Sequence, residues 1–352
     1  MPHAPQDRLS DVAAFGTNPG NLRARIHVPE RLAAGAPLVV VLHGCTQSAA
    51  GYDEGSGWSH LADRHGFALL FPEQQRANNS NLCFNWFQPG DSRRGGGEAE
   101  SIRQMIDWMA AHQAIDRSRI FVTGLSAGGA MASVMLAAYP ELFAAGAVIA
   151  GIAYGRADDL GEALASMGGR GRQSRAELGG SVRAASSHAG PWPRVSVWHG
   201  SSDHVVNASN GEDIVQQWLA VHGIDGAPDS VDRVDGYPRR RWLGADGQVL
   251  VEQMEITGMG HGTPLAPGDE AGQSGVAGPH MLDVAISSTD RIAAFWGIAP
   301  DVAPTAAKPR TAPREPVQRA APRPKQASVR ASPVNNVQAT IENALRSAGL
   351  LR

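Results

Sequence analysis

Ser126 is the residue of this chain best placed to act as a nucleophile. Residues 124–128 read G-L-S-A-G, between a β-like run at 119–123 and a helix-like run at 129–138. A G-x-S-x-G turn between strand and helix projects the serine Oγ above the sheet. The glycines let strand and helix pass closely because they carry no Cβ. The helix that follows aims its first N–H groups at a developing oxyanion. The alternative is a Gly/Ser-rich turn that only connects two elements.

A serine nucleophile needs a general base and a carboxylate that orients the base. Asp203 follows the strand-like run 195–198, and His261 follows the β-rich run 249–256. This gives the order Ser, Asp, His that a nucleophile on such a turn requires. We therefore predict Asp203 as the carboxylate and His261 as the base, although an Asx-turn would also explain Asp203. Twelve histidines occur, and the rivals for the base are His199, His204 and His280.

The oxyanion that forms during acyl transfer needs two N–H donors. One is the N–H of Ala127, which follows the nucleophile. The other is expected in the loop 43–47, H-G-C-T-Q, after the apolar run 38–42. Gly44 permits a tight turn that leaves the N–H of Cys45 free to face a substrate. The loop can equally be read as a buried strand ending in a turn, and both readings can hold together.

The elements that must position these residues alternate between β-branched runs and helical patterns, which is typical of a mostly parallel sheet flanked by helices. The predicted strands are 22–28, 38–42, 68–71, 120–123, 145–150, 195–198 and 249–256. The predicted helices are 57–65, 98–112, 128–139, 210–222 and 289–296. The fold class is therefore α/β.

Composition excludes several classes of protein. The chain of 352 residues has a net charge of −3, so nothing global indicates a nucleic-acid partner. No apolar run approaches the roughly 20 residues that span a bilayer. Residues 1–8 lack the apolar core of a secretory signal, which predicts a cytoplasmic protein. Two cysteines, Cys45 and Cys83, are too few for a cysteine-rich zinc site and leave one disulfide open. We expect no cofactor and no metal.

The composition changes near residue 300. We predict a catalytic domain at 1–299, a disordered linker rich in Pro, Ala and Arg at 300–333, and a short amphipathic helix at 334–352. The apolar stripe of that helix is Val337, Ile341 and Leu345. Such a segment could dock the enzyme on a polymer granule or an anionic surface through its basic linker, or it could be a frayed tail.

Three motifs together resemble the esterases of the polyhydroxybutyrate depolymerase family, within the α/β-hydrolase superfamily. They are H-G-C-T-Q at 43–47, C-F-N-W-F at 83–87 and G-L-S-A-G-G at 124–129. The resemblance covers about residues 20–299 and implies the α/β-hydrolase fold. It also implies a triad of Ser126, Asp203 and His261, with the N–H groups of Cys45 and Ala127 as oxyanion donors.

The same resemblance implies that Cys45 and Cys83 lie close together, often as a disulfide in secreted members, which makes an extracellular location the alternative. A contact between these cysteines would carry Asn85 and Trp86 to the mouth of the oxyanion hole, where we predict that they bind substrate. Trp86 could instead be a core residue. The long stretch 154–191, with one expected helix at 158–167, is a candidate lid or groove wall.

The expected activity is that of a serine carboxylesterase acting on poly- or oligo(3-hydroxybutyrate)-type esters through an acyl-enzyme. The chain departs from secreted relatives at Gly262-Thr263, where they often have Ala-Trp after the catalytic histidine, and it shows no separate substrate-binding domain. These departures favour amorphous polymer or soluble oligomers as substrate. The alternatives are a feruloyl or acetylxylan esterase, a serine peptidase, and a non-catalytic protein that binds granules or surfaces.

Overall fold

The computed structural model describes residues 7–268 and 270–301. The chain divides into two compact units, Met1–Pro304 and Thr305–Arg352. The second unit lies wholly outside the described residues. The predicted linker beyond residue 301 and the predicted helix at 334–352 lie outside them too.

A ten-stranded sheet forms the centre of the first unit, in the order β1-β2-β4-β3-β5-β6-β7-β10-β9-β8. The six strands from β4 to β10 run parallel, and β1, β2, β9 and β8 extend the two ends in antiparallel fashion. A separate parallel pair joins β11 to β12. The strands are β1 Ser10–Val12, β2 Arg23–His27, β3 Ala36–Leu42, β4 Ala68–Glu73, β5 Ile115–Leu125, β6 Ala145–Ile149, β7 Arg194–Gly200, β8 Ser230–Val234, β9 Tyr237–Leu243, β10 Val249–Ile256, β11 Thr263–Leu265 and β12 Met281–Asp283.

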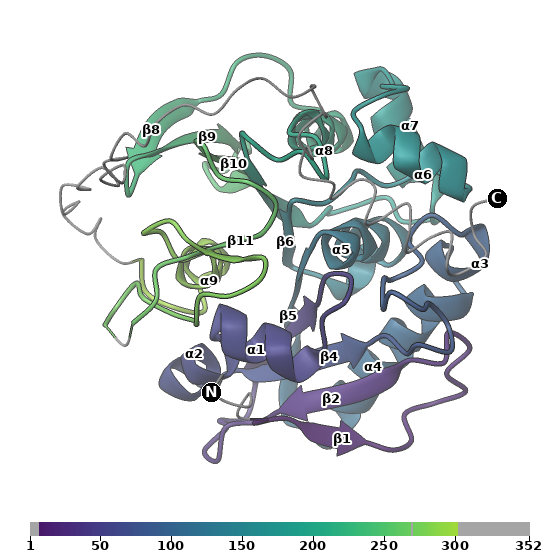
Figure 1. The fold of residues 1–352 in the computed structure, drawn as a ribbon, viewed down its shortest axis with the longest axis vertical. Helices are drawn as coiled ribbons and strands as arrows, with labels where there is room; N and C mark the ends of the chain where they lie inside the picture. Colours follow the sequence, from purple (N-terminus) through teal and green to yellow (C-terminus); the bar gives the residue numbers. More distant parts are fainter. Residues whose placement is uncertain (1–6, 269, 302–352) are drawn as a thin grey trace, which may run out of the picture. The chain divides into compact units, whose positions relative to one another are not determined.

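Helices cover both faces of the sheet (Figure 1). The α-helices are α1 Ala49–Ser56, α2 Trp58–His65, α3 Pro89–Ser92, α4 Gly97–His112, α5 Ala127–Ala138, α6 Leu160–Met167, α7 Arg175–Ala184, α8 Ser209–His222 and α9 Ser288–Trp296, and a 3-10 turn occupies Pro140–Leu142. In the view of Figure 1, α1, α2 and α9 lie to the left of the sheet, while α4, α5 and α8 lie to the right.

Two hydrophobic cores follow from the alternation of side chains along each strand. In β3 every residue is buried, because both faces are covered by helices. Leu38, Val40 and Leu42 pack into the core under α4, α5 and α8. Val39 and Val41 pack into the core under α1, α2 and α9. The unbroken apolar run that predicted this strand is thus the pattern of a central parallel strand.

The seven predicted strands and the five helices predicted at 57–65, 98–112, 128–139, 210–222 and 289–296 are present, most of them with ends shifted by a few residues. The stretch 154–191 was expected to hold one helix and contains two, α6 and α7. Helix α7 packs closely on α8, since a Cβ at Gly179 would come within 2.6 Å of the Cβ of Ala220. The prediction of a single helix is therefore wrong, because α7 is fixed both by its own sequence pattern and by this contact between residues 41 apart in sequence. A role for this stretch as a groove wall stays a prediction.

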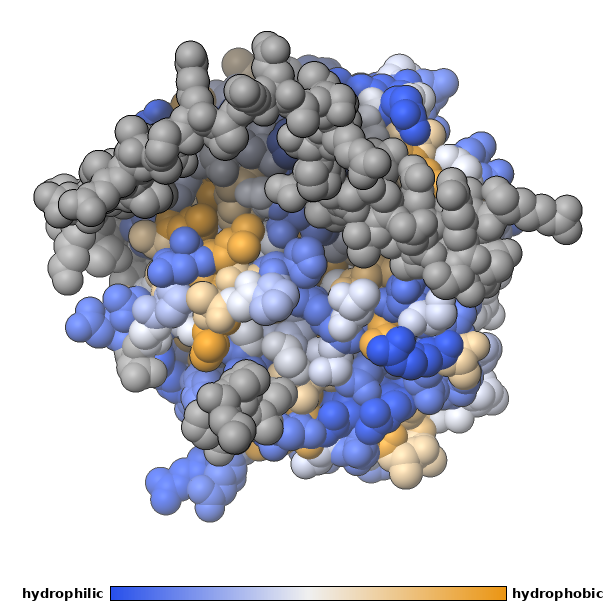
Figure 2. Space-filling view, in the orientation of Figure 1, coloured by the Kyte–Doolittle hydropathy of each residue, from blue (hydrophilic) through white to orange (hydrophobic). Residues whose placement is uncertain are grey.

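The carboxyl ends of the parallel strands meet at one edge of the sheet, where ligand sites of open α/β sheets lie. The loops after β3, β5, β7 and β10 therefore converge there. The face in Figure 2 is mostly hydrophilic, with apolar residues in small areas between polar ones. In the part of the chain that the structure describes, no helix has the length and apolarity needed to cross a membrane.

Candidate active site

Ser126 occupies a strained turn between β5 and α5, with φ 57° and ψ −117°. Positive φ is rare for residues other than glycine and costs about 1–3 kcal/mol. The turn is possible because its glycines allow contact between backbones. A Cβ on Gly128 would lie 2.3 Å from the carbonyl oxygen of Leu42, and one on Gly124 would lie 2.4 Å from the carbonyl carbon of Gly128. The N–H of Ser126 donates to the carbonyl of Ile149 at 2.9 Å, which ties the turn to β6.

The structure brings Ser126, His261 and Asp203 together. The Nε2 of His261 lies 2.9 Å from the Oγ of Ser126, and its Nδ1 lies 2.7 Å from Oδ2 of Asp203. A carboxylate only accepts hydrogen bonds, so Nδ1 carries the ring proton and Nε2 is free to accept the proton of the serine. This is the arrangement of a nucleophile, a general base and an orienting carboxylate.

Asp203 is buried, and its second oxygen accepts two backbone bonds at 2.9 Å, from the N–H groups of Val205 and Val206. Burial alone would raise the pKa of Asp203, but hydrogen bonds from His199 and His261 outweigh it and hold that pKa well below the usual range. His199 approaches the same oxygen as His261, with Nε2 2.9 Å from the carbonyl of Val206 and 3.5 Å from Oδ2 of Asp203. Asp203 is thus stabilised as an anion by two imidazoles and two backbone N–H groups.

His280 lies beside the base but makes a different contact. Its ring is exposed and meets the ring of His261 edge to face, with centroids 5.8 Å apart. Its Nδ1 donates to the backbone carbonyl of His261 at 3.2 Å. Within the part of the chain that the structure describes, it is His261 and neither His199 nor His280 that hydrogen-bonds the Oγ of Ser126, which is the position a general base requires.

His43 fixes the loop that follows β3. The N–H of Gln74 donates to Nε2 of His43 at 3.1 Å, and Nδ1 of His43 donates to the carbonyl of Gly44 at 2.8 Å. Burial lowers the pKa of His43, which favours the neutral ring that this pair of bonds requires. The Gly44 carbonyl and the Cys45 N–H belong to one planar peptide and point in opposite directions. The bond from His43 therefore also fixes the direction of the Cys45 N–H.

The N–H groups of Cys45 and Ala127 have no acceptor recorded among the described residues. Ala127 is the first residue of α5, where backbone N–H groups have no partner within the helix. The neighbouring N–H of Gly44, in contrast, is occupied by Oε1 of Gln47 at 2.8 Å. The geometry thus leaves two donors near Ser126 that could bind an oxyanion.

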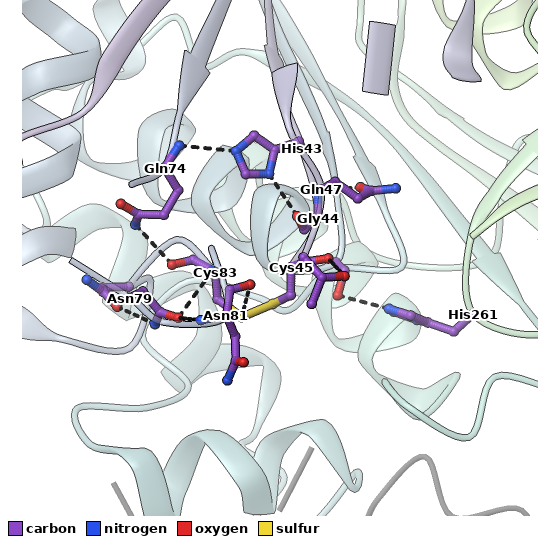
Figure 3. The surroundings of a disulfide bond; sticks show 12 residues. His43, Gly44, Cys45, Gln47, Gln74, Asn79, Asn81, Cys83 and His261 are labelled. Atoms are coloured by element: carbon purple, nitrogen blue, oxygen red, sulfur yellow. Dashed lines mark hydrogen bonds between the residues drawn. A yellow bond between two sulfur atoms is a disulfide. The ribbon is translucent and has the colours of Figure 1, made fainter. Parts of the chain in front are cut away.

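Cys45 and Cys83 form a disulfide, with their Cα atoms 4.2 Å apart (Figure 3). A backbone bond from the N–H of Thr46 to the carbonyl of Asn81, at 2.7 Å, runs beside it. Together they join the loop after β3 to the loop after β4. Figure 3 shows Cys83 and the disulfide on one side of Cys45 and His261 on the other.

Asn85 and Trp86 follow the disulfide, but their contacts are internal. Asn85 is buried, donates to Glu98 from both its backbone and side-chain nitrogens, and accepts a bond from Asn79. Trp86 is 9% exposed, belongs to the hydrophobic core and packs edge to face on Phe87. Their predicted role in substrate binding stays a prediction, and the observed contacts show how they hold the loop.

Sequence reasoning missed His43, Gln74, Glu98 and the second contact of His199. Only His43 carried a signal, since it stands at the end of a buried strand in the motif that contains Cys45. In the ranges 7–268 and 270–301, no group of three or more His, Cys, Asp or Glu side chains is arranged to hold a metal ion.

The fold and the arrangement of the site define a protein of the α/β-hydrolase type. The family model described as esterase PHB depolymerase matches residues 25–236. The chain is 50% identical over 291 residues to poly(3-hydroxyalkanoate) depolymerase C of Paucimonas lemoignei, covering 82% of this chain and 70% of that protein. It is 32% identical over 270 residues to acetylxylan esterase A of Aspergillus oryzae, covering 74% of this chain and 86% of that one.

Among solved structures, the acetyl xylan esterase from Aspergillus awamori matches with a TM-score of 0.69 and 28% identity, covering 83% of this chain and 99% of that chain. The chain therefore belongs to the esterase PHB depolymerase family and is a carboxylic ester hydrolase.

Proposed function

We propose that this chain is a serine carboxylesterase that hydrolyses ester bonds of poly- or oligo(3-hydroxybutyrate)-type substrates. The observation that carries the mechanism is the continuous hydrogen-bonded series Ser126–His261–Asp203, at 2.9 and 2.7 Å. The 50% identity to a poly(3-hydroxyalkanoate) depolymerase supports the substrate class.

In this mechanism the Oγ of Ser126 forms a bond to the carbonyl carbon of the ester, and its proton passes to Nε2 of His261. The Cys45 and Ala127 N–H groups bind the oxyanion, and the anion of Asp203 stabilises the imidazolium. His261 returns the proton to the alcohol oxygen as the bond between that oxygen and the acyl carbon breaks, and an acyl-enzyme remains. Water then attacks the acyl carbon while His261 takes its proton, and His261 passes that proton to the Oγ of Ser126 as the bond between Oγ and the acyl carbon breaks, which releases the acid.

The substrate assignment is tested by the products that the enzyme releases. The purified protein is incubated in parallel with amorphous poly(3-hydroxybutyrate), acetylated xylan and feruloylated xylan. We expect 3-hydroxybutyrate or its oligomers to be released fastest. A second candidate function, deacetylation of xylan, is favoured by the TM-score of 0.69 to an acetyl xylan esterase that is matched over 99% of its length. Faster acetate release would establish that function in place of the first.

The disulfide bears on where the enzyme acts. Disulfides persist in oxidising compartments and are rare in reducing cytosol. Because Cys45–Cys83 joins two loops of the site, we place the working enzyme in an oxidising compartment, the extracellular alternative to the cytoplasmic prediction. Fractionation of producing cells tests this proposal. Enzyme found outside the cytoplasm with no free thiol supports it, and fully active cytoplasmic enzyme with two free thiols contradicts it.

The segment beyond residue 302 is proposed to serve location and not chemistry. It contributes no member of the Ser126–His261–Asp203 series, and its lysines and arginines contrast with the net charge of −3 of the whole chain. Truncation after Pro300 should retain turnover of a soluble ester and lose activity only on particulate polymer, with a loss that shrinks at high salt. Loss of soluble-ester turnover would contradict this division.

A further inference from the structure

Glu98 is a buried carboxyl group that the hydrolytic steps above do not use. It lies in the first turn of α4 and is 1% exposed. Burying a carboxyl group is costly unless its oxygens are hydrogen-bonded. Among the described residues, the hydrogen-bond donors to those oxygens are Gln74 and Asn85, which lie on either side of Cys83 in the chain. Glu98 is therefore linked to the loop that carries the disulfide.

Three donors converge on this carboxyl. Asn85 donates from its backbone N–H to Oε2 at 2.8 Å and from Nδ2 to Oε1 at 2.9 Å. Gln74 donates from Nε2 to Oε1 at 2.5 Å. The same Nε2 lies 2.9 Å from the carbonyl of Cys83. Glu98 therefore binds Gln74, which follows β4 and contacts the carbonyl of Cys83, and Asn85, which stands two residues after Cys83 in the chain.

The network continues to the oxyanion loop from the other end of Gln74. The backbone N–H of Gln74 donates to His43, and His43 donates to the carbonyl of Gly44. The disulfide joins Cys45 of the same loop to Cys83, whose carbonyl also accepts a hydrogen bond from Gln74 (Figure 3). A movement of Gln74 would therefore displace the Gly44–Cys45 peptide through His43, and a movement of Cys83 would displace it through the disulfide.

We propose that Glu98 is a positioning residue for the oxyanion loop, acting through Gln74 on His43 and through Asn85 and Cys83 on the disulfide. The inference rests on the proposed function, because it assigns the Cys45 N–H to the oxyanion. Burial first, and then the charge of Asp91 on α3, raise the pKa of Glu98 to about 8. Asp91 also accepts a bond from the backbone N–H of Glu98 at 3.2 Å. The hydrogen bonds from Asn85 and Gln74 act in the opposite direction and lower the pKa of Glu98, because they favour the ionised carboxylate, but they do not outweigh burial and the charge of Asp91.

The test compares Glu98→Gln with Glu100→Gln, a carboxyl variant on the same helix. Glu100 accepts hydrogen bonds from Arg103, Gln104 and Tyr139, and none of the hydrogen bonds to its carboxyl group among the described residues comes from either loop of the site. In Glu98→Gln the amide nitrogen cannot accept from one of the three donors. We expect kcat for a soluble ester, per active site titrated, to fall about tenfold with little change in KM, because an oxyanion donor acts in the transition state. Glu100→Gln should keep the kcat of the parent.

A second readout does not depend on activity. Dithiothreitol opens the disulfide, and the released thiols are counted with a chromogenic disulfide reagent. In Glu98→Gln the loop should open more often, so thiol release should be several times faster than in the parent and in Glu100→Gln. If Glu98→Gln does not fold, Gln74→Ala breaks the link between Glu98 and Cys83 while leaving the carboxyl group in place, and it should show both effects.

Parent values for both kcat and thiol release in folded Glu98→Gln, or in Gln74→Ala, would overturn the proposal, even if the melting temperature falls. Failure of the proposed function would look different. The parent enzyme would then release no acid from hydroxybutyrate esters, while the difference in thiol release between Glu98→Gln and Glu100→Gln would still be measurable.

Discussion

The two sides of the active-site edge hold their residues by different means. Ser126 is held by the backbone immediately around it: β5 leads into it, α5 leads out, two glycines permit close backbone contacts, and its own N–H donates to Ile149 on the neighbouring strand β6. The Cys45 peptide is held from a distance, through His43, Gln74 and the disulfide to Cys83. Changes on the first side should therefore alter chemistry with little effect on stability, whereas changes on the second side should alter both.

Removal of the nucleophile should give the largest loss. Ser126→Ala eliminates the acyl-enzyme route, and we expect kcat to fall by about 10⁴–10⁶-fold. The free energy of unfolding should stay within about 1 kcal/mol, because alanine must adopt the same turn. Steady-state kinetics and urea unfolding of one preparation measure both quantities. A loss of stability of several kcal/mol would show that the elbow is not a self-contained segment.

Asp203→Asn should come next. The amide can donate to Nδ1 of His261 and so favours the wrong tautomer, which predicts a loss of about 10³–10⁴-fold in kcat. His199→Gln serves as the comparison, since His199 contacts the same carboxylate without reaching Ser126. It should cost far less, and equal losses in the two variants would mean that His199 and His261 are a single functional pair.

Loss of the disulfide should affect both properties at once. Cys45→Ala/Cys83→Ala removes a covalent link between residues 38 apart in sequence. From the entropy of loop closure in the unfolded chain, we expect the free energy of unfolding to fall by about 3–4 kcal/mol. We expect kcat to fall about tenfold as well, because the Cys45 N–H loses one of its anchors. Retained kcat with lowered stability would confine the disulfide to a structural role.

The titration of Glu98 should appear as a pH dependence of stability. Its pKa is raised from 4.5 to about 8 in the folded chain, so the folded state binds the proton more tightly than the unfolded state. The contribution of Glu98 to the free energy of unfolding is fully present below pH 4.5, and it is lost as the pH rises through about 8. Urea unfolding from pH 5 to 9 should show the parent losing stability relative to Glu98→Gln, and a constant difference between the two would contradict it.

The contrast between the two sides also explains what the sequence could predict. The motif around Ser126 is local, and Asp203 and His261 stand directly after strands that the sequence indicates. The role of Glu98 depends on Gln74 and Asn85, which no short motif links to it. The hairpin of β8 and β9, which was not predicted, does carry a local signal: its two-residue turn is Asp235-Gly236, with φ of 50° and 88°. Helix α7 had one too, the capping box of Ser174 and Glu177.

The central claim is that Ser126 forms a covalent bond to the substrate's acyl group with His261 as its base. The direct measurement uses an organophosphonate ester, which traps the activated serine, followed by peptide mass spectrometry of the labelled enzyme. We predict one adduct, on Ser126, that forms in the parent, is absent from Ser126→Ala and forms far more slowly in His261→Gln. An adduct on another residue, or labelling of Ser126 at the parent rate in His261→Gln, would contradict the account.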